Sequence, residues 1–159
     1  MLNMRQAVIV TFVLTTLILS TITTYSAYSY FQVYTAVRTF SVTIESFQLN
    51  IVDSVIATEI QIQNPSDVAF ELLLIEERIE ANFEYIMNTG LYRTLDPLPL
   101  PPSRNLSVII TSIVPSTKTS AVMARLEDYW QLSIRVRLSG PVVEEFFLER
   151  FFTTEIEAF

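Results

Sequence analysis

The sequence predicts an antiparallel β-sandwich that follows a single membrane-spanning helix. Three observations support this prediction: an uncharged apolar stretch near the N-terminus, seven or eight short β-type segments after residue 40, and turn signals between those segments. A chain of 159 residues has room for one domain of ordinary size beside such a helix. We expect a cytoplasmic N-terminus (1–6), a transmembrane helix (7–30), a juxtamembrane connector (31–39) and an extracytoplasmic domain (40–159).

The amino-acid composition excludes much catalytic chemistry. Because the chain has no histidine and no cysteine, it cannot form a Ser-His-Asp triad, a Cys-His dyad, a thiolate or imidazole metal site, or a disulfide. Its two glycines, Gly90 and Gly140, are too far apart for a phosphate-binding GxxxxGK or GxGxxG loop. We therefore expect no enzymatic activity, no cofactor and no metal ion.

The domain after residue 39 is acidic, with eight basic against seventeen acidic residues. An acidic domain lacks the positive field that neutralises phosphates, so we expect no nucleic-acid partner. Three pairs of adjacent carboxylates occur, Glu76-Glu77, Glu127-Asp128 and Glu144-Glu145. Neighbours in a strand point to opposite faces and no calcium-type loop is present, so we expect these carboxylates to be solvated.

The first predicted element is the membrane helix. From Gln6 to Val37 no residue carries a formal charge, and about 20 residues suffice to cross a hydrocarbon core of about 30 Å. Four tyrosines are the amphipathic residues expected at the headgroup boundary, Tyr25, Tyr28, Tyr30 and Tyr34. The positive charge of Arg5 favours a cytoplasmic N-terminus, which places the domain on the other side of the membrane.

Two alternatives remain open within this segment. It could be a signal peptide cleaved near Ser26-Ala27, but a single basic residue and a poor cleavage site favour a retained anchor. A stripe of small and hydroxylated residues recurs at helical spacing, Thr16, Ser20, Thr24 and Ala27. This stripe is either a packing face for a partner membrane helix or a set of hydroxyls bonded to their own helix.

The next segments read as strands, with one ambiguous region. Residues 40–52 and 55–63 are rich in β-branched and aromatic residues, and Asn64-Pro65 ends the second of them. Residues 69–87 favour a helix by propensity, although a period-two pattern at Phe70, Leu72 and Leu74 and again at Ile79, Ala81 and Phe83 also permits two paired strands. A turn at Thr89-Gly90 and the proline-rich run 96–103 would end any helix.

The C-terminal half contains one predicted helix and the closing strands. Residues 106–114 form a strand, and residues 116–128 form a helix capped by Ser116 or Thr117, with Val122, Leu126 and Tyr129 on one face. Residues 130–138 alternate as a half-buried strand, residues 139–141 turn the chain, and residues 142–159 give one or two strands.

The order of features after residue 40 resembles the late embryogenesis abundant type-two domain, also called the water stress and hypersensitive response domain. The specific parts of the resemblance are Asn64-Pro65 after a strand and Pro101-Pro102-Ser103 before an apolar strand. The resemblance covers about 120 residues but lacks the glycine that this family carries before the proline-rich run. It implies a fibronectin-type or immunoglobulin-like sandwich, strands over 70–87, an N-terminal membrane helix in many members, and no catalytic residues to transfer.

Two surface features are candidate sites. Asn105-Leu-Ser107 is an acceptor sequence for N-glycosylation. Neighbouring phenylalanines in a strand point to opposite faces, so some members of the C-terminal aromatic group must point outward and could form a contact surface. This group consists of Phe146, Phe147, Phe151 and Phe152, with Phe159 beyond them.

We hypothesise that the chain is a non-enzymatic single-pass membrane protein, an accessory or structural subunit of a membrane or cell-envelope assembly. Its partners would be the membrane and other membrane or envelope proteins, or copies of itself. Two alternatives are a secreted filament subunit that donates residues 31–52 as a strand to its neighbour, and a module that binds a lipid or another apolar ligand between its sheets.

Overall fold

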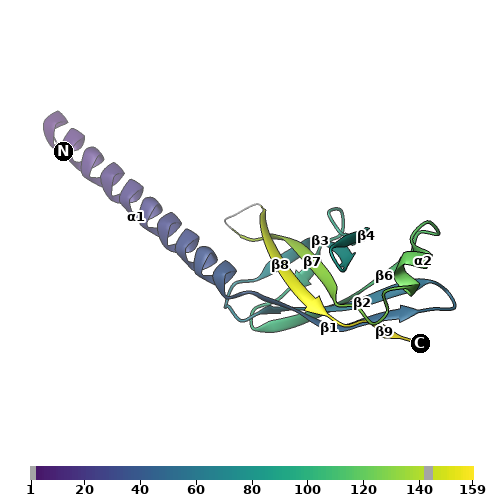
Figure 1. Ribbon diagram of the computed structural model, residues 1–159. Coiled ribbons are helices and arrows are strands. Elements are labelled where there is room, and N and C mark those ends of the chain that lie inside the picture. Colours follow the sequence, from purple (N-terminus) through teal and green to yellow (C-terminus); the bar gives the residue numbers. More distant parts are fainter. Residues whose placement is uncertain (1–2, 142–144) are drawn as a thin grey trace.

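The computed structural model describes residues 3–141 and 145–159 and consists of one long helix and two packed β-sheets (Figure 1). The elements are α1 (Met4–Thr39), β1 (Ser41–Asn50), β2 (Val55–Asn64), β3 (Phe70–Ala81), β4 (Glu84–Tyr92), β5 (Leu98–Leu100), β6 (Arg104–Ile113), α2 (Thr119–Met123), β7 (Trp130–Ser139), β8 (Phe146–Thr154) and β9 (Glu157–Ala158). The predicted sandwich-like arrangement is confirmed, although the 36-residue helix means that the chain is not strictly all-β.

Helix α1 begins at a capping box and ends where the first strand begins. The Asn3 side chain accepts a hydrogen bond from the backbone N–H of Gln6, and the Gln6 side chain accepts one from the N–H of Asn3. Phe40 adopts an extended conformation and terminates the helix. Residues 31–39 were expected to form a separate connector but continue the same helix, because Val33 and Ala36 are buried against the sandwich.

The strands form two sheets that pack face to face. The first sheet has the order β6-β2-β1-β9, and the second has the order β4-β3-β7-β8 with β5 paired to β3. All pairings are antiparallel except that of β1 with β9, which is parallel and two residues long. In Figure 1, α1 extends from one end of the sandwich, whereas α2 and the C-terminus lie near the opposite end.

Apolar side chains from both sheets fill the interior. Strands β2 and β7 alternate buried residues with more exposed ones, as β7 does from Trp130 to Ser139. Phe40, Phe70 and Phe146 form an aromatic cluster at the end nearest α1, with ring centroids 5.0–6.4 Å apart. Further along, the buried Trp130 ring lies 5.7 Å from that of Phe47. These contacts join the first strand to the last strands of the chain.

The ambiguous region 69–87 is β-structure and not helix. Strand β3 pairs with β4 on one side and with β7 on the other, so it lies inside the second sheet. The turn predicted at Thr89-Gly90 is wrong, because both residues lie within β4. The chain turns instead at Asn82 and Phe83, which have positive φ values of 48° and 64° and form the two-residue connection of a hairpin.

The helix predicted over 116–128 is also wrong in its extent. Only Thr119–Met123 is helical, and Lys118 is its N-cap without a side-chain hydrogen bond. Val122 is buried as expected, but Tyr129 is 67% exposed. Five residues form little more than one helical turn, which tertiary contacts and not propensity must stabilise.

Candidate functional site

Helix α1 is long and apolar enough to cross a membrane by length and composition, and the most apolar part is not buried against the rest of the protein. The predicted stripe Thr16, Ser20, Thr24 and Ala27 is exposed along its length. The Thr16 hydroxyl donates to the carbonyl of Phe12 (2.8 Å), as Thr15, Thr21 and Thr23 do to the carbonyls four residues before them. The stripe therefore offers small side chains, but at Thr16 the hydroxyl is already bonded within the helix.

The four tyrosines at the C-terminal half of α1 are exposed as well. Tyr25, Tyr28, Tyr30 and Tyr34 are 49–72% exposed and are distributed around the helix. The Arg38 guanidinium lies 5.7 Å from the centroid of the Tyr34 ring, and the Gln32 amide donates to the Tyr28 hydroxyl. Tyr34 directly follows the buried Val33, so this tyrosine and the contact between α1 and the sandwich lie at the same height along the helix.

The two parts of the sequence that carry the family resemblance meet in the structure. Asn64 is fully buried, and its amide donates to the carbonyls of Val68 (2.8 Å), Leu100 (3.3 Å) and Pro101 (3.1 Å). Its carbonyl oxygen accepts from the backbone and the hydroxyl of Ser66. The backbone N–H of Ser103, which follows Pro101 and Pro102, donates to the carbonyl of Ser66. This is a structural site that fastens the end of β2, together with Pro65, to β5.

The C-terminal phenylalanines divide between the two faces of β8, as alternation predicted. Phe146 and Phe152 point inward and pack against the core. Phe147 and Phe151 point outward and are 56% and 76% exposed. The C-terminal Phe159 is also exposed, beside Leu49 and Ile51 at the other end of the sandwich.

The outer face of the second sheet is hollowed into a trough of about 990 Å³. Strand register places its side chains in rows across the sheet, from β4 through β3 and β7 to β8. The rows are Tyr85-Glu80-Gln131-Thr153, Asn88-Arg78-Ser133-Phe151, Gly90-Glu76-Arg135-Glu149 and Tyr92-Leu74-Arg137-Phe147. We call the hollow the outer trough; four residues of these rows lie beside it and do not line it, namely Tyr85, Leu74, Arg137 and Phe147. No sequence motif marked it, because it is assembled from four strands that only the fold brings together.

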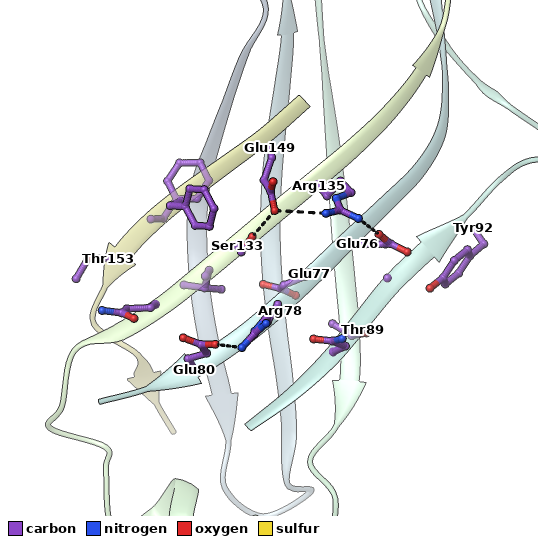
Figure 2. Close-up of a pocket in the computed structure, with 16 residues that line it drawn as sticks. Glu76, Glu77, Arg78, Glu80, Thr89, Tyr92, Ser133, Arg135, Glu149 and Thr153 are labelled. Carbon is purple, nitrogen blue, oxygen red and sulfur yellow. Dashed lines mark hydrogen bonds and ion pairs between the residues drawn. The ribbon is translucent and has the colours of Figure 1, made fainter. Parts of the chain in front are cut away.

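The charged groups in the outer trough are paired with one another. Figure 2 shows Arg135 between Glu76 and Glu149, with 3.7 Å from a guanidinium nitrogen to each carboxylate. Arg78 pairs with Glu80, and Ser133 donates to Glu149. At 3.7 Å the Arg135 pairs are longer than ordinary hydrogen bonds, so its N–H groups can still bond elsewhere.

Glu77 was expected to be solvated, and that expectation is wrong. Its neighbour Glu76 points outward, whereas Glu77 points between the sheets and is 1% exposed. Burial raises the pKa of Glu77 from 4.5 to about 7, and the Thr58 hydroxyl on the facing sheet offsets a smaller part of that rise. Glu77 Oε1 and Thr58 Oγ1 both lack a hydrogen-bond partner of normal geometry, so the Thr58 hydroxyl stabilises the Glu77 carboxylate only weakly.

The remaining candidate residues lie apart from these sites. Asn105 is exposed on β6, an edge strand, where its amide lies 3.4 Å from the Gln61 side-chain oxygen. Glu127 and Asp128 follow α2, and Glu144 lies outside the described residues. Within residues 3–141 and 145–159, no three acidic side chains converge in a way that could hold a metal ion.

Comparison with solved structures identifies proteins of the same fold. A protein assigned to the late embryogenesis abundant class superposes with a TM-score of 0.55 at 13% identity, covering 88% of this chain and 83% of that one. A protein from Arabidopsis thaliana gives 0.52 at 16% identity, covering 74% and 77%. A Bordetella pertussis protein assigned as ApaA gives 0.50 at 14% identity, covering 74% and 92%. At these identities the likeness shows the fold alone.

The structural likeness confirms the resemblance to late embryogenesis abundant proteins that the sequence indicated. No family model and no curated protein matches the sequence.

Proposed function

We propose that this is a non-enzymatic single-pass membrane protein whose β-sandwich stands outside the cytoplasm as a structural or accessory subunit of a membrane or cell-envelope assembly. The observation that carries the proposal is the continuity of α1, which runs from its apolar segment into the sandwich, where Val33 and Ala36 are buried. A helix fastened in this way holds the sandwich at a fixed position above the membrane. A structural subunit must hold its domain at a fixed height above the membrane, and a flexible linker between helix and domain would not do so.

The levels of the side chains along α1 agree with a retained anchor. The uncharged segment before Tyr25 is long enough for the hydrocarbon core, and the tyrosines from Tyr25 to Tyr34 then fall at the headgroup boundary. The positive charge of Arg5 favours a cytoplasmic N-terminus. The sandwich, which contacts Val33, would thus stand directly on the membrane surface.

The same helix leaves one side free for a protein partner. At about 100° per residue, the stripe Thr16, Ser20, Thr24 and Ala27 lies about 165° around α1 from Val33 and Ala36. Another membrane helix could therefore pack on the stripe without meeting the side of α1 that binds the sandwich. The exposed Phe147 and Phe151 and a glycan at Asn105 would be further contacts of the sandwich, whose assignment to the fibronectin type is part of this proposal.

The two alternative functions have less support. In the strand-donation model residues 31–52 would be extended and free, but residues 31–39 are helical and β1 already pairs with β2 and β9. In the lipid-binding model the ligand would lie between the sheets, but buried apolar side chains occupy that interior and the outer trough lies on an outer face.

Labelling of single introduced cysteines would test the membrane topology. The natural chain has no cysteine, so no other residue of it would react with a thiol reagent. We expect a membrane-impermeant maleimide to label Leu95→Cys, whose native side chain is fully exposed on the sandwich, in intact cells. Met4→Cys should react only after the cells are permeabilised. Labelling of Met4→Cys alone in intact cells would overturn the orientation.

Mass spectrometry of the protein extracted in a mild detergent would test the anchor and the assembly together. We expect a chain that retains residues 1–30 and that co-purifies with at least one other membrane or envelope protein. A mature N-terminus near Ala27 would contradict the anchor, and a monomer without partners in every detergent would contradict the accessory role.

A further inference from the structure

The arrangement of aromatic and charged residues in the outer trough suggests a ligand. The two central strands, β3 and β7, contribute polar and charged side chains, apart from Leu74. The two outer strands, β4 and β8, each contribute one exposed aromatic ring to the lining of the trough, Tyr92 (66% exposed) and Phe151 (76% exposed), with Tyr85 and Phe147 further along the same strands. A sheet face that is only solvated needs no aromatic borders, because single exposed apolar residues are scattered on ordinary surfaces and not aligned on both sides of a hollow.

The charge of the outer trough differs from that of the domain around it. Besides the buried Glu77, its lining contains three carboxylates, Glu76, Glu80 and Glu149, and two guanidinium groups, Arg78 and Arg135. The trough therefore carries only a small negative charge, most of it compensated by ion pairs, within a domain that has eight basic against seventeen acidic residues. Such a surface does not attract anionic polymers such as nucleic acid.

The side chains that line the trough are suited to bind the hydroxyl groups of a ligand. The main chains of β3 and β7 are paired on both sides, so the face between the rings offers side-chain donors and acceptors only. Carboxylates accept and guanidinium groups donate, and a hydroxyl can do both at once. A peptide would instead use the free main-chain groups of an edge strand.

The depth and width of the trough suit a chain-like ligand. The small Ser133 lies in its second row, where a larger side chain would fill the hollow. Gly90 has a different role, because a Cβ there would lie 2.5 Å from the Ile75 carbonyl oxygen, so the close approach of β4 to β3 requires glycine. The aromatic borders on β4 and β8 are separated by three strand spacings, about 14 Å. Tyr92 in Figure 2 lies on the β4 side and Thr153 on the β8 side, with the ion pairs of Arg135 between them.

From these observations we propose that the outer trough binds a neutral oligosaccharide or polysaccharide chain, with its hydroxyls on Glu76, Arg78, Arg135 and Glu149 and its apolar ring faces against Tyr92 and Phe151. The half-exposed ion pairs of Arg135 contribute little to stability, so their groups are free to rearrange around a ligand. This site would bind the sandwich to a glycan layer outside the membrane.

Calorimetric titration of the full chain in phosphatidylcholine nanodiscs tests the proposal. Nanodiscs are needed because glycoside detergents carry a sugar that would compete for the site. The probes are cellohexaose, maltoheptaose and mannohexaose, with a hyaluronan hexasaccharide as an anionic comparison. We expect saturable binding of at least one neutral probe and weaker or no binding of hyaluronan.

Substitutions locate the binding in the trough. Tyr92→Ala and Phe151→Ala should each weaken binding about fivefold, since a ring contact of this kind is worth roughly 1 kcal/mol and 1.4 kcal/mol is tenfold. Ser133→Phe should abolish binding by filling the hollow. Tyr129→Ala is the matched control, because Tyr129 is 67% exposed, close to the 66% of Tyr92, but lies outside the trough.

The proposal is overturned if no neutral probe binds with a Kd below about 10 mM, which corresponds to a binding free energy weaker than roughly −3 kcal/mol. It is also overturned if hyaluronan alone binds, or if Tyr129→Ala weakens binding as much as Tyr92→Ala. Circular dichroism of each variant separates lost binding from a misfolded sandwich.

Discussion

At the scale of single residues, the buried polar side chains Asn64 and Glu77 differ in whether their polar atoms find hydrogen-bond partners. Asn64 completes five hydrogen bonds with Val68, Leu100, Pro101 and Ser66, so its burial carries no penalty and fixes the loop after β2. Glu77 has at least one oxygen without a partner and would bury a charge in an apolar interior. The first residue stabilises the fold, and the second makes stability depend on protonation.

We expect the sandwich to be less stable at neutral pH than in mild acid because of Glu77. Between the unfolded pKa of 4.5 and the folded pKa of about 7, the folded protein holds a proton that the unfolded chain has lost. The contribution of Glu77 is therefore fully present below about pH 4.5 and declines as the pH rises to 7. The total loss is about 3 kcal/mol, from 1.36 kcal/mol for each unit of pKa difference.

Urea unfolding in nanodiscs between pH 5 and 8 would measure this loss, with the fluorescence of the single, fully buried Trp130 as the signal. The Glu77→Gln variant should lose most of the pH dependence and be more stable than the natural protein at pH 8. The control is Glu76→Gln, which removes the neighbouring carboxylate from the outer face. Equal slopes in the natural protein and Glu77→Gln would show that Glu77 does not titrate in this range.

The sequence contained a signal for Glu77 that a β-bulge obscured. Counting forward by two from Phe70 and Leu72 gives Leu74 and Glu76 as inward residues. The register shifts between Leu72 and Leu74, so the true inward set continues through Ile75 and Glu77 to Ile79. Counting back from Ile79 gives Glu77 correctly, but only the structure shows where the shift occurs.

At the scale of elements, strand pairing determines the secondary structure of regions where local propensity favours a different structure. The strands over 55–64 and 130–139 were predictable because apolar and polar residues alternate in them, and the strand over 41–50 because it is rich in β-branched and aromatic residues. Strand β3 is rich in helix-forming residues but lies between β4 and β7, and pairing on both sides outweighs propensities of a few tenths of a kcal/mol per residue.

The outer trough could not be predicted for a related reason. Its residues are unremarkable within each strand, and their alignment depends on the register between four strands. Only the outward-facing phenylalanines beside this surface were predictable from the sequence, since Phe147 and Phe151 alternate with residues that point into the core.

The stripe on α1 leads to a prediction about the helix as an element. Replacing Thr16 and Ser20 by leucine should reduce the recovery of a membrane partner at least severalfold in mild detergent, because bulk on a small-residue face separates two helices. The helix itself should be unaffected, since its backbone hydrogen bonds are unchanged. Co-purification followed by quantitative mass spectrometry would measure the effect.

A control for this experiment is the pair Thr15→Leu and Thr21→Leu, which removes two hydroxyls from other sides of α1. Both hydroxyls bond their own helix, as that of Thr16 does. If the two double variants reduce recovery equally, the stripe is not the partner face.

At the scale of the whole molecule, the junction between α1 and the sandwich is the feature that unites the two parts. Val33, Ala36, Val37 and Phe40 recur at helical spacing, and this pattern was present in the sequence. The expected connector over 31–39 is instead the last part of α1. The structure shows that one segment is both the end of the helix and a part of the core of the sandwich.

This junction predicts that the sandwich cannot swing freely relative to α1. Spin labels at Thr21→Cys in the helix and Thr111→Cys on β6 should give a narrow distance distribution in nanodiscs by electron–electron resonance. Val33→Asp with Val37→Asp should broaden that distribution, because buried unpaired carboxylates cost several kcal/mol and would detach the helix from the core. A distribution as broad in the natural junction as in this variant would mean that the sandwich hangs on a hinge.

Thr35→Asp is the matched control for this experiment, because it adds a charge to an exposed position between Val33 and Ala36. It should leave the distribution narrow. A label pair within the sandwich, Leu95→Cys with Thr111→Cys, should stay equally narrow in all variants, and a change there would mean that the substitutions unfold the domain. A fixed junction would orient the outer trough and the edge of β8 relative to the membrane, as the proposed contacts with a partner and with a glycan require.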